Sequence, residues 1–166
     1  MATWSEAFAA QALSDLQAYD LLNRSTLPIS HRLHYLQMWL EKLCKAYLWS
    51  PGALPIASKV SHNVVADVLP KLIVEHWRWI GFEQRPNRKK IWELCREIDL
   101  LHPQVDDNNR RPKNVEYPWK AITGEVEVPA HWEFSLASML YSNQGKMLLK
   151  AADRLTRKPA VFIRRG

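Results

Sequence analysis

Few residues in this sequence combine a reactive type with a spacing that could support chemistry. The chain has no glycine-rich phosphate loop, no HExxH pair and no GxSxG elbow, and its carboxylates are scattered. An arginine precedes a histidine at short range twice: Arg96 and His102 have five residues between them, and Arg24 and His31 have six. A guanidinium can stabilise developing negative charge and an imidazole can transfer a proton, but an arginine and a histidine at such spacings also arise often by chance.

The two pairs differ in where they fall. The second pair spans an expected loop, so we interpret it as a coincidence. Arg96 and His102 fall in an expected helix, residues 86–102, along which six residues turn about 600° and leave the side chains about 120° apart. Pro103 should end this helix beside His102 and relax that geometry. The alternative is structural: Arg96 pairs with a local carboxylate and His102 caps the helix end.

Two other pairs of reactive residues, one of histidines and one of cysteines, do not indicate a metal site or a disulfide. His31 and His34 lie three residues apart on one helical face, but no carboxylate motif accompanies them, which favours a surface role. Cys44 and Cys95 fall on the apolar sides of expected helices, so we expect buried free thiols, as in a reducing cytoplasm. We expect no metal and no cofactor.

Helices are the elements that must position these residues, because apolar residues recur along the chain at helical spacing. The expected helices span residues 5–23, 31–49, 58 or 61 to 80, 86–102, and part of 129–156. Pro70 should kink the third helix or restart a turn, and Gly145 could divide the last. The predicted fold is an all-α, up-and-down bundle of four to five helices. Residues 1–156 would form one domain, and residues 157–166 a basic C-terminal tail.

A long segment before the last helix, residues 104–130, shows no helical periodicity. Residues 126–128 could form a short extended piece within it. Such a long irregular segment is uncommon in a compact domain and is usually functional, packed on the bundle or mobile. Local crowding of polar and aromatic side chains predicts a polar pocket formed by Arg110, Arg111, Glu116, Tyr117 and Trp119.

The formal net charge of +6 is a C-terminal feature. Residues 146–166 contain seven basic residues and one acid, whereas the rest of the chain carries 16 of each sign. The basic residues are Lys146, Lys150, Arg154, Arg157, Lys158, Arg164 and Arg165. They could bind the phosphates of RNA or DNA. The alternative is a solvated tail whose cations favour the dipole of the last helix.

Eight tryptophans are present, and we expect most of them to pack in the core or at its rim. The alternative for some of them is a surface on which bases or a partner protein stack. The N-terminus lacks a signal-peptide pattern, and no run of about 18 apolar residues occurs. We therefore expect a cytoplasmic protein without a membrane span.

Three segments carry a resemblance to a known family. The stretch YLQMWLEKLCKAYL, residues 35–48, followed after a loop by SHNVVADVL, residues 61–69, resembles the central pattern of HEPN domains. The upstream stretch DLQAYDLL, residues 15–22, resembles the first helix of that family. His62 corresponds to the histidine of the family's T/S-H signature. Many members carry an Arg-Tyr-Pro motif where this chain reads Glu116-Tyr-Pro, so the role of that arginine is not carried over.

The HEPN resemblance covers about residues 10–120 and implies a helical bundle. Catalytic HEPN ribonucleases share an Arg-x(4–6)-His motif whose residues meet at a dimer cleft. In this chain Arg96 and His102 would take those places, stabilising the phosphorane and moving the 2′-hydroxyl proton without a metal. The resemblance implies a homodimer that binds or processes RNA in a bacterial stress, toxin–antitoxin or defence setting. The alternative is a non-catalytic scaffold or protein-binding subunit, for example the partner of a nucleotidyltransferase.

Overall fold

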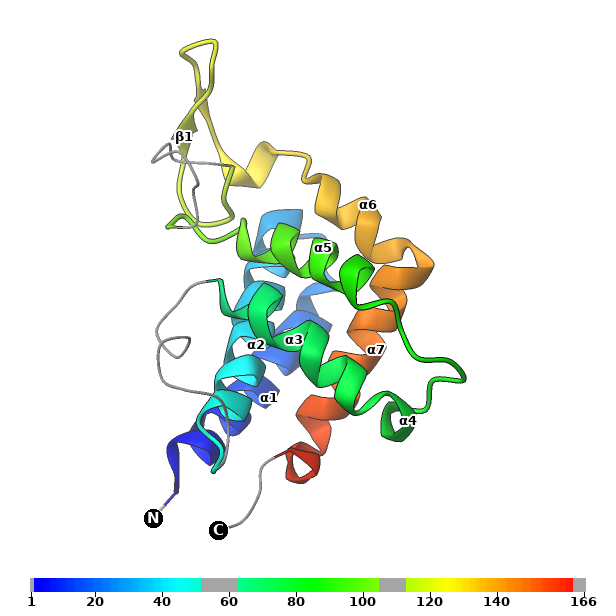
Figure 1. Ribbon diagram of the computed structural model, residues 1–166. Coiled ribbons are helices and arrows are strands. Elements are labelled where there is room, and N and C mark those ends of the chain that lie inside the picture. Colours follow the sequence, from blue (N-terminus) through cyan, green and yellow to red (C-terminus); the bar gives the residue numbers. More distant parts are fainter. Residues whose placement is uncertain (1, 52–62, 105–112, 163–166) are drawn as a thin grey trace.

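The computed structural model describes residues 2–51, 63–104 and 113–162, and this part of the chain is mostly helical (Figure 1). The α-helices are α1 (Trp4–Leu22), α2 (Ile29–Leu48), α3 (Val64–Glu75), α4 (Trp77–Ile80), α5 (Arg88–Asp99), α6 (Ser135–Tyr141) and α7 (Asn143–Arg157). The other elements are the 3-10 helices η2 (Pro129–His131) and η3 (Pro159–Val161) and a hairpin of β1 (Trp119–Lys120) and β2 (Val126–Glu127). The prediction of an all-α bundle is confirmed.

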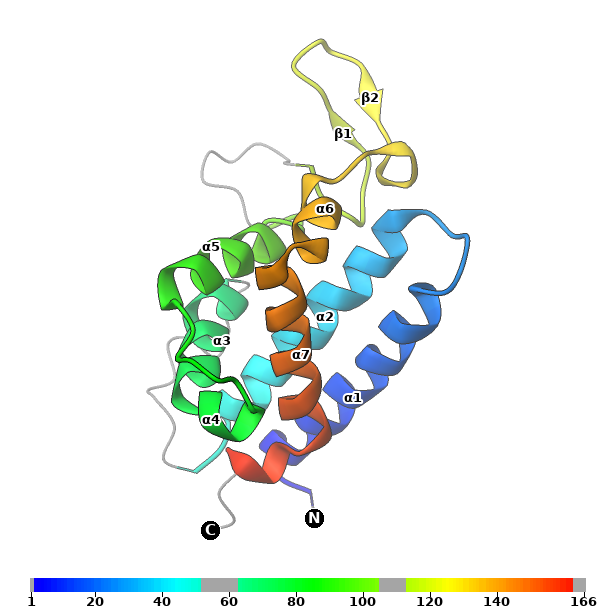
Figure 2. The same cartoon turned by 90° about the vertical axis from the view of Figure 1, so that its right-hand side faces the viewer.

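The two longest helices, α1 and α2, lie side by side and are joined by a short connection (Figure 2). A capping box begins α1: the backbone N–H of Glu6 donates to Thr3 Oγ1 at 3.2 Å, and the N–H of Thr3 donates to Glu6 Oε2 at 2.8 Å. At the same end, the hydroxyl of Ser5 donates to the carbonyl oxygen of Ala46 at 2.6 Å. These bonds fix the start of α1 and hold it against the end of α2.

Trp39 of α2 is among the largest fully buried side chains. Its indole N–H donates to the hydroxyl of Thr156 on α7 at 2.7 Å, and its ring centroid lies 5.6 Å from that of Tyr19 on α1. Other members of its apolar stripe are also buried, namely Leu36, Leu40 and Leu43. The predicted core face of α2 is therefore confirmed, and it packs between α1 and α7.

The third helix follows the expected path only in part. Its expected start at Ser58 or Ser61 lies outside the described residues. The helix continues across the buried Pro70 to Glu75, and the break falls at His76, where α4 begins. Gly81 ends α4 with φ +81°, a left-handed conformation that favours glycine.

The hairpin lies in the segment that was expected to be irregular. Trp119 pairs with Glu127 and Lys120 with Val126 in antiparallel register, so the extended piece at 126–128 is confirmed by β2. Both views place the hairpin at one end of the molecule and the start of α1, together with η3, at the other (Figures 1 and 2).

The last helix is divided at Ser142 and not at Gly145. The Ser142 hydroxyl accepts a hydrogen bond from the N–H of Gly145 at 3.1 Å and so caps α7. A Cβ on Gly145 would lie 2.5 Å from the Leu140 Cα and from the carbonyl oxygens of Met139 and Leu140. Only glycine therefore allows α6 and α7 to meet this closely.

Candidate nucleic-acid interface

Helix α7 carries a basic stripe along its exposed side. Lys146, Lys150 and Arg154 follow one another at intervals of four residues, which places them on one helical face, and the exposed Lys158 is the C-cap residue of the helix. The opposite side is apolar and buried, through Leu148, Ala151, Ala152 and Leu155. Because this apolar side packs against the bundle, the cations of α7 are held toward solvent.

The end of α4 lies on this basic stripe. The guanidinium of Arg154 donates to the carbonyl oxygen of Ile80, and Lys150 Nζ lies 5.8 Å from the centroid of the Phe82 ring. A Cβ on Gly81 would lie 2.6 Å from Arg154 Nη1, so the backbone of Gly81 lies close to the Arg154 guanidinium. These contacts place α4 beside the second half of α7 (Figure 2).

An exposed indole completes the surface. Trp79 of α4 is 41% exposed and lines a recess of about 390 Å³ together with Asp153, Arg154, Arg157 and Lys158. Arg157 donates to Asp153 Oδ1 at 2.7 Å, which holds its guanidinium at the recess. We call the surface formed by these residues with Lys146 and Lys150 the α7 face.

The prediction that the basic residues near the C-terminus bind nucleic-acid phosphates stays a prediction, and it did not include the residues that lie beside them in the fold. Trp79 was not singled out, and the segment between α4 and α5 together with the first turn of α5 adds the exposed cations Arg85, Arg88, Lys89 and Lys90. This segment connects two helices that both pack against α7 (Figure 1). Its basic run was visible in the sequence, but only the tertiary contacts of α4 and α5 associate it with α7. The predicted residues Arg164 and Arg165 lie outside the described residues.

Comparison of the chain with protein-family models, with curated proteins and with solved structures finds no match. The HEPN resemblance therefore stays a prediction.

Arg96 and His102 each have a local partner. Arg96, in the last turn of α5, donates from Nη1 to Asn63 Oδ1 at 3.0 Å, at the start of α3. His102 lies beyond the end of the helix, where its Nδ1 accepts from the N–H of Gln104 at 3.2 Å. These contacts resemble the structural alternative, with the amide of Asn63 in place of the expected carboxylate. His62 lies outside the described residues.

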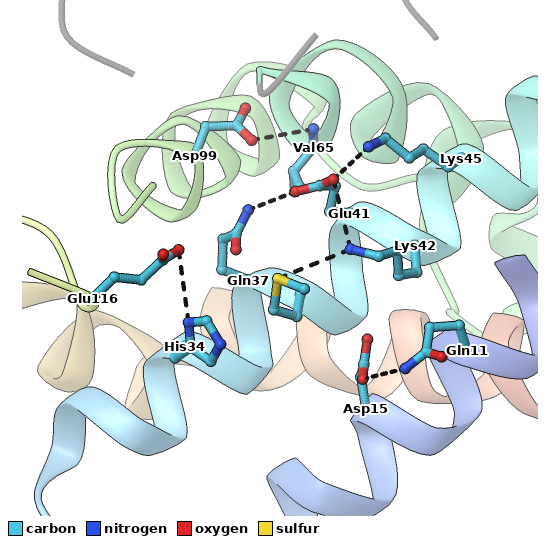
Figure 3. A network of polar contacts seen from close by, with 11 residues as sticks. Gln11, Asp15, His34, Gln37, Glu41, Lys42, Lys45, Val65, Asp99 and Glu116 are labelled. Carbon is cyan, nitrogen blue, oxygen red and sulfur yellow. Dashed lines mark hydrogen bonds and ion pairs between the residues drawn. The ribbon is translucent and has the colours of Figure 1, made fainter. Parts of the chain in front are cut away.

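Asp99, which sequence analysis did not single out, holds the start of α3 beside Arg96. Its fully buried carboxylate accepts a hydrogen bond from the N–H group of Val65 at 3.3 Å (Figure 3) and another from the N–H group of Ala66 at 2.8 Å. Burial raises the pKa of Asp99 to about 7, although the two hydrogen bonds and the charge of Arg96 oppose this rise. The side chains at the end of α5 therefore hydrogen-bond to the start of α3 and hold it in place.

The polar residues of the HEPN-like stretch form a network within α2 (Figure 3). Glu41 is 4% exposed, accepts from Gln37 Nε2 at 2.9 Å and pairs with Lys45 Nζ at 2.5 Å. Burial alone would raise the pKa of Glu41, but the hydrogen bonds from Lys45 and Gln37 and the charges of Lys42 and Lys45 lower it overall. This network satisfies a buried charge inside the bundle and gives these residues a structural role.

The residues of the predicted polar pocket have different neighbours. Glu116 lies 3.8 Å from His34 Nδ1 on α2, whereas Trp119 packs against Trp132, with ring centroids 5.4 Å apart. Tyr117 is exposed. Arg110 and Arg111 lie outside the described residues. The cavity that Trp119 lines does not include Glu116 or Tyr117, so their proximity in sequence did not bring them together.

Cys44 and Cys95 are buried free thiols, as predicted, and burial raises the pKa of both. Among residues 2–51, 63–104 and 113–162, no group of three or more His, Cys, Asp or Glu side chains could hold a metal ion. In the same residues, no helix is both long and apolar enough to cross a membrane.

Proposed function

We propose that this protein binds RNA through the α7 face. The observation that carries the proposal is the recess in which the exposed indole of Trp79 adjoins Arg154, Arg157 and Lys158. An aromatic ring can stack on an unpaired base, and neighbouring cations neutralise the phosphates on either side of it. The exposed basic stripe of α7 continues from this recess and could follow the phosphates of a nucleic-acid chain. Because stacking on Trp79 needs an unpaired base, single-stranded RNA is the form that fits best.

The HEPN resemblance supports the same substrate class. It implies a homodimer that binds or processes RNA in a bacterial stress, toxin–antitoxin or defence setting. Its catalytic form would use Arg96 and His102 and would need no metal. Because Arg96 already contacts Asn63, binding through the α7 face is the part of the proposal that the geometry supports best.

Substitution of Trp79 tests the binding site. Fluorescence anisotropy with labelled single-stranded RNA should show that Trp79→Ala weakens binding by roughly 1–3 kcal/mol, the usual contribution of one base–aromatic stack. Trp4→Ala is the matched control, since Trp4 is 65% exposed and packs on Phe8 and Trp49, none of which lines the recess. Equal affinities of the two variants and the wild type would remove Trp79 from the site.

Cleavage is tested separately with a mixed RNA pool in EDTA. The catalytic form predicts cleavage by the wild type and none by the Arg96→Ala/His102→Ala double variant. His102→Gln alone keeps the contact between Arg96 and Asn63, so it separates lost chemistry from lost stability. If RNA is bound by all variants and cleaved by none, the protein binds RNA without processing it.

A second candidate is a protein-binding subunit, as in the nucleotidyltransferase pairing. It is favoured by the exposed aromatic pair Trp4 and Trp49, whose ring centroids lie 5.8 Å apart at one end of the molecule. This candidate predicts no measurable RNA affinity at physiological salt. It also predicts that Trp4→Ala weakens a complex with the partner protein while Trp79→Ala does not.

A further inference from the structure

A larger cavity lies at the hairpin end of the molecule, away from the recess at Trp79. It has a volume of about 800 Å³ and is formed by the hairpin, the end of α5 and the start of α6. Its floor is apolar, through the buried side chains of Leu101, Phe134 and Leu136. The volume and the apolar floor are typical of a site for a small organic molecule. We call it the hairpin cavity.

Two tryptophans form aromatic walls of the hairpin cavity. The rings of Trp119 and Trp132 meet edge to face, with an interplanar angle of 78° and centroids 5.4 Å apart. Lys113, which also lines the cavity, places its ammonium group 4.4 Å from the centroid of the Trp132 ring. A cation from the chain itself therefore already occupies an aromatic face of this cavity, and such contacts are favourable for ammonium groups in general.

The charges around the hairpin cavity are opposite in sign to those of the chain. Four glutamates and two lysines line it, a net charge of −2, whereas the chain carries +6. They are Glu97 on α5, Glu125 and Glu127 on the hairpin, Glu133 before α6, and Lys113 and Lys120. Within the described part of the chain, none of the four carboxylates forms an ion pair or a hydrogen bond. The cavity thus offers unpaired negative charge from three elements around an apolar floor.

We propose that the hairpin cavity binds a linear organic diamine or polyamine. The methylene stem of such a ligand packs on the apolar floor and on Trp119. Its ammonium groups pair with glutamates contributed by different elements, and one of them replaces Lys113 on the face of Trp132. A single inorganic cation would leave the aromatic and apolar surface unused, and a neutral ligand would leave the carboxylates unpaired. The proposal does not depend on RNA binding, which the α7 face carries.

Isothermal titration calorimetry on RNA-free protein tests the proposal with 1,4-diaminobutane and spermidine as probes. Both should bind saturably, and 1,4-butanediol, which has the same stem without charge, should bind at least about tenfold more weakly. Excess Mg²⁺ should not displace them. No saturable binding, equal binding of the diol, or displacement by Mg²⁺ would each overturn the proposal.

Variants of the cavity give the sharper test. Glu125→Gln/Glu127→Gln should weaken spermidine binding by about tenfold, whereas Glu83→Gln, in the segment after α4, should not change it. Lys113→Met should strengthen binding severalfold, because it removes the competing cation from Trp132. A gain of affinity cannot come from misfolding, so unchanged or weaker binding by Lys113→Met contradicts the proposal. If a lysine-rich peptide binds and neither amine does, the cavity binds a peptide, and the proposed diamine or polyamine ligand is wrong.

Discussion

Asp99 shows how one buried residue couples the stability of this protein to pH. Its pKa is about 7 in the folded chain and 3.8 is its ordinary value, so between these values the folded state holds a proton that the unfolded state releases. The stabilising contribution of Asp99 to the free energy of unfolding is therefore fully present below about pH 3.8. It is lost as the pH rises through about 7. Each pH unit of this window corresponds to roughly 1.4 kcal/mol.

Asp99→Asn should remove that dependence. Urea unfolding at about pH 5 and about pH 8 should show the variant gaining stability relative to the wild type at the higher pH. Asp20→Asn changes an exposed carboxylate and is the matched control, which should keep the pH dependence of the wild type. A stability difference between Asp99→Asn and the wild type that is the same at both pH values would contradict the assignment.

The hydrogen bond between Trp39 and Thr156 predicts a second effect at the residue scale. Thr156→Val leaves the buried indole N–H without its acceptor, which should cost about 1–3 kcal/mol of unfolding free energy. Thr156→Ser keeps the hydroxyl and should cost clearly less. Thermal or urea unfolding of both variants measures the difference, and equal losses would show that the methyl group matters and the hydrogen bond does not.

Among elements, the junction of α6 and α7 depends on Gly145. Gly145→Ala should destabilise the protein by about 1–3 kcal/mol, because the added Cβ would meet backbone atoms of Met139 and Leu140 that cannot move independently. Gln144→Ala, one residue earlier, should change stability by less than about 0.5 kcal/mol. Circular dichroism during urea unfolding compares the two, and a neutral Gly145→Ala would mean that the helices can separate at little cost.

Elements whose apolar periodicity is local could be predicted from the sequence. The stripes of α1, α2 and α5 are each contained in one stretch of chain, and the helices lie close to their expected limits. The hairpin could not be predicted beyond its second strand, because Trp119 packs against Trp132 and pairs with β2, and no periodicity in the sequence encodes these contacts. The break at Ser142 was missed because a cap depends on the backbone of both helices.

The difference between local pattern and tertiary contact also explains what the sequence could predict of the α7 face and of the pocket expected around Glu116. The basic residues of the last helix could be singled out from the sequence because they lie close together along the chain. Trp79 and the segment after α4 lie beside them through tertiary contacts, such as those of Ile80 and Phe82 with α7, which no local pattern encodes. The crowding around Glu116 was misleading, since neighbours in an irregular segment can face different elements.

At the scale of the whole molecule, charge is divided between two regions. The α7 face is basic, and the hairpin cavity at the end of the bundle is acidic. This division lets one chain attract a polyanion on one surface and cations on another, and it predicts that neutralising either region leaves binding at the other unchanged. RNA affinity of the Glu125→Gln/Glu127→Gln variant measures this independence, and a change of more than a few fold would show that the two regions are coupled.

RNA binding through the α7 face is best tested by its dependence on salt concentration. Lys146→Gln/Lys150→Gln/Lys158→Gln removes three cations of the α7 face without touching the bond between Arg154 and Ile80. For single-stranded RNA, each lost phosphate contact should lower the slope of log affinity against log salt by about 0.7, so the slope should fall by about 2.

The control neutralises three exposed cations elsewhere, as Arg24→Gln/Lys113→Gln/Lys120→Gln, and so has the same net charge as the α7 variant. This control should keep the slope and the affinity of the wild type, whereas both should be lower in the α7 variant. Equal slopes for the two triple variants, or no RNA binding by the wild type, would contradict RNA binding through the α7 face.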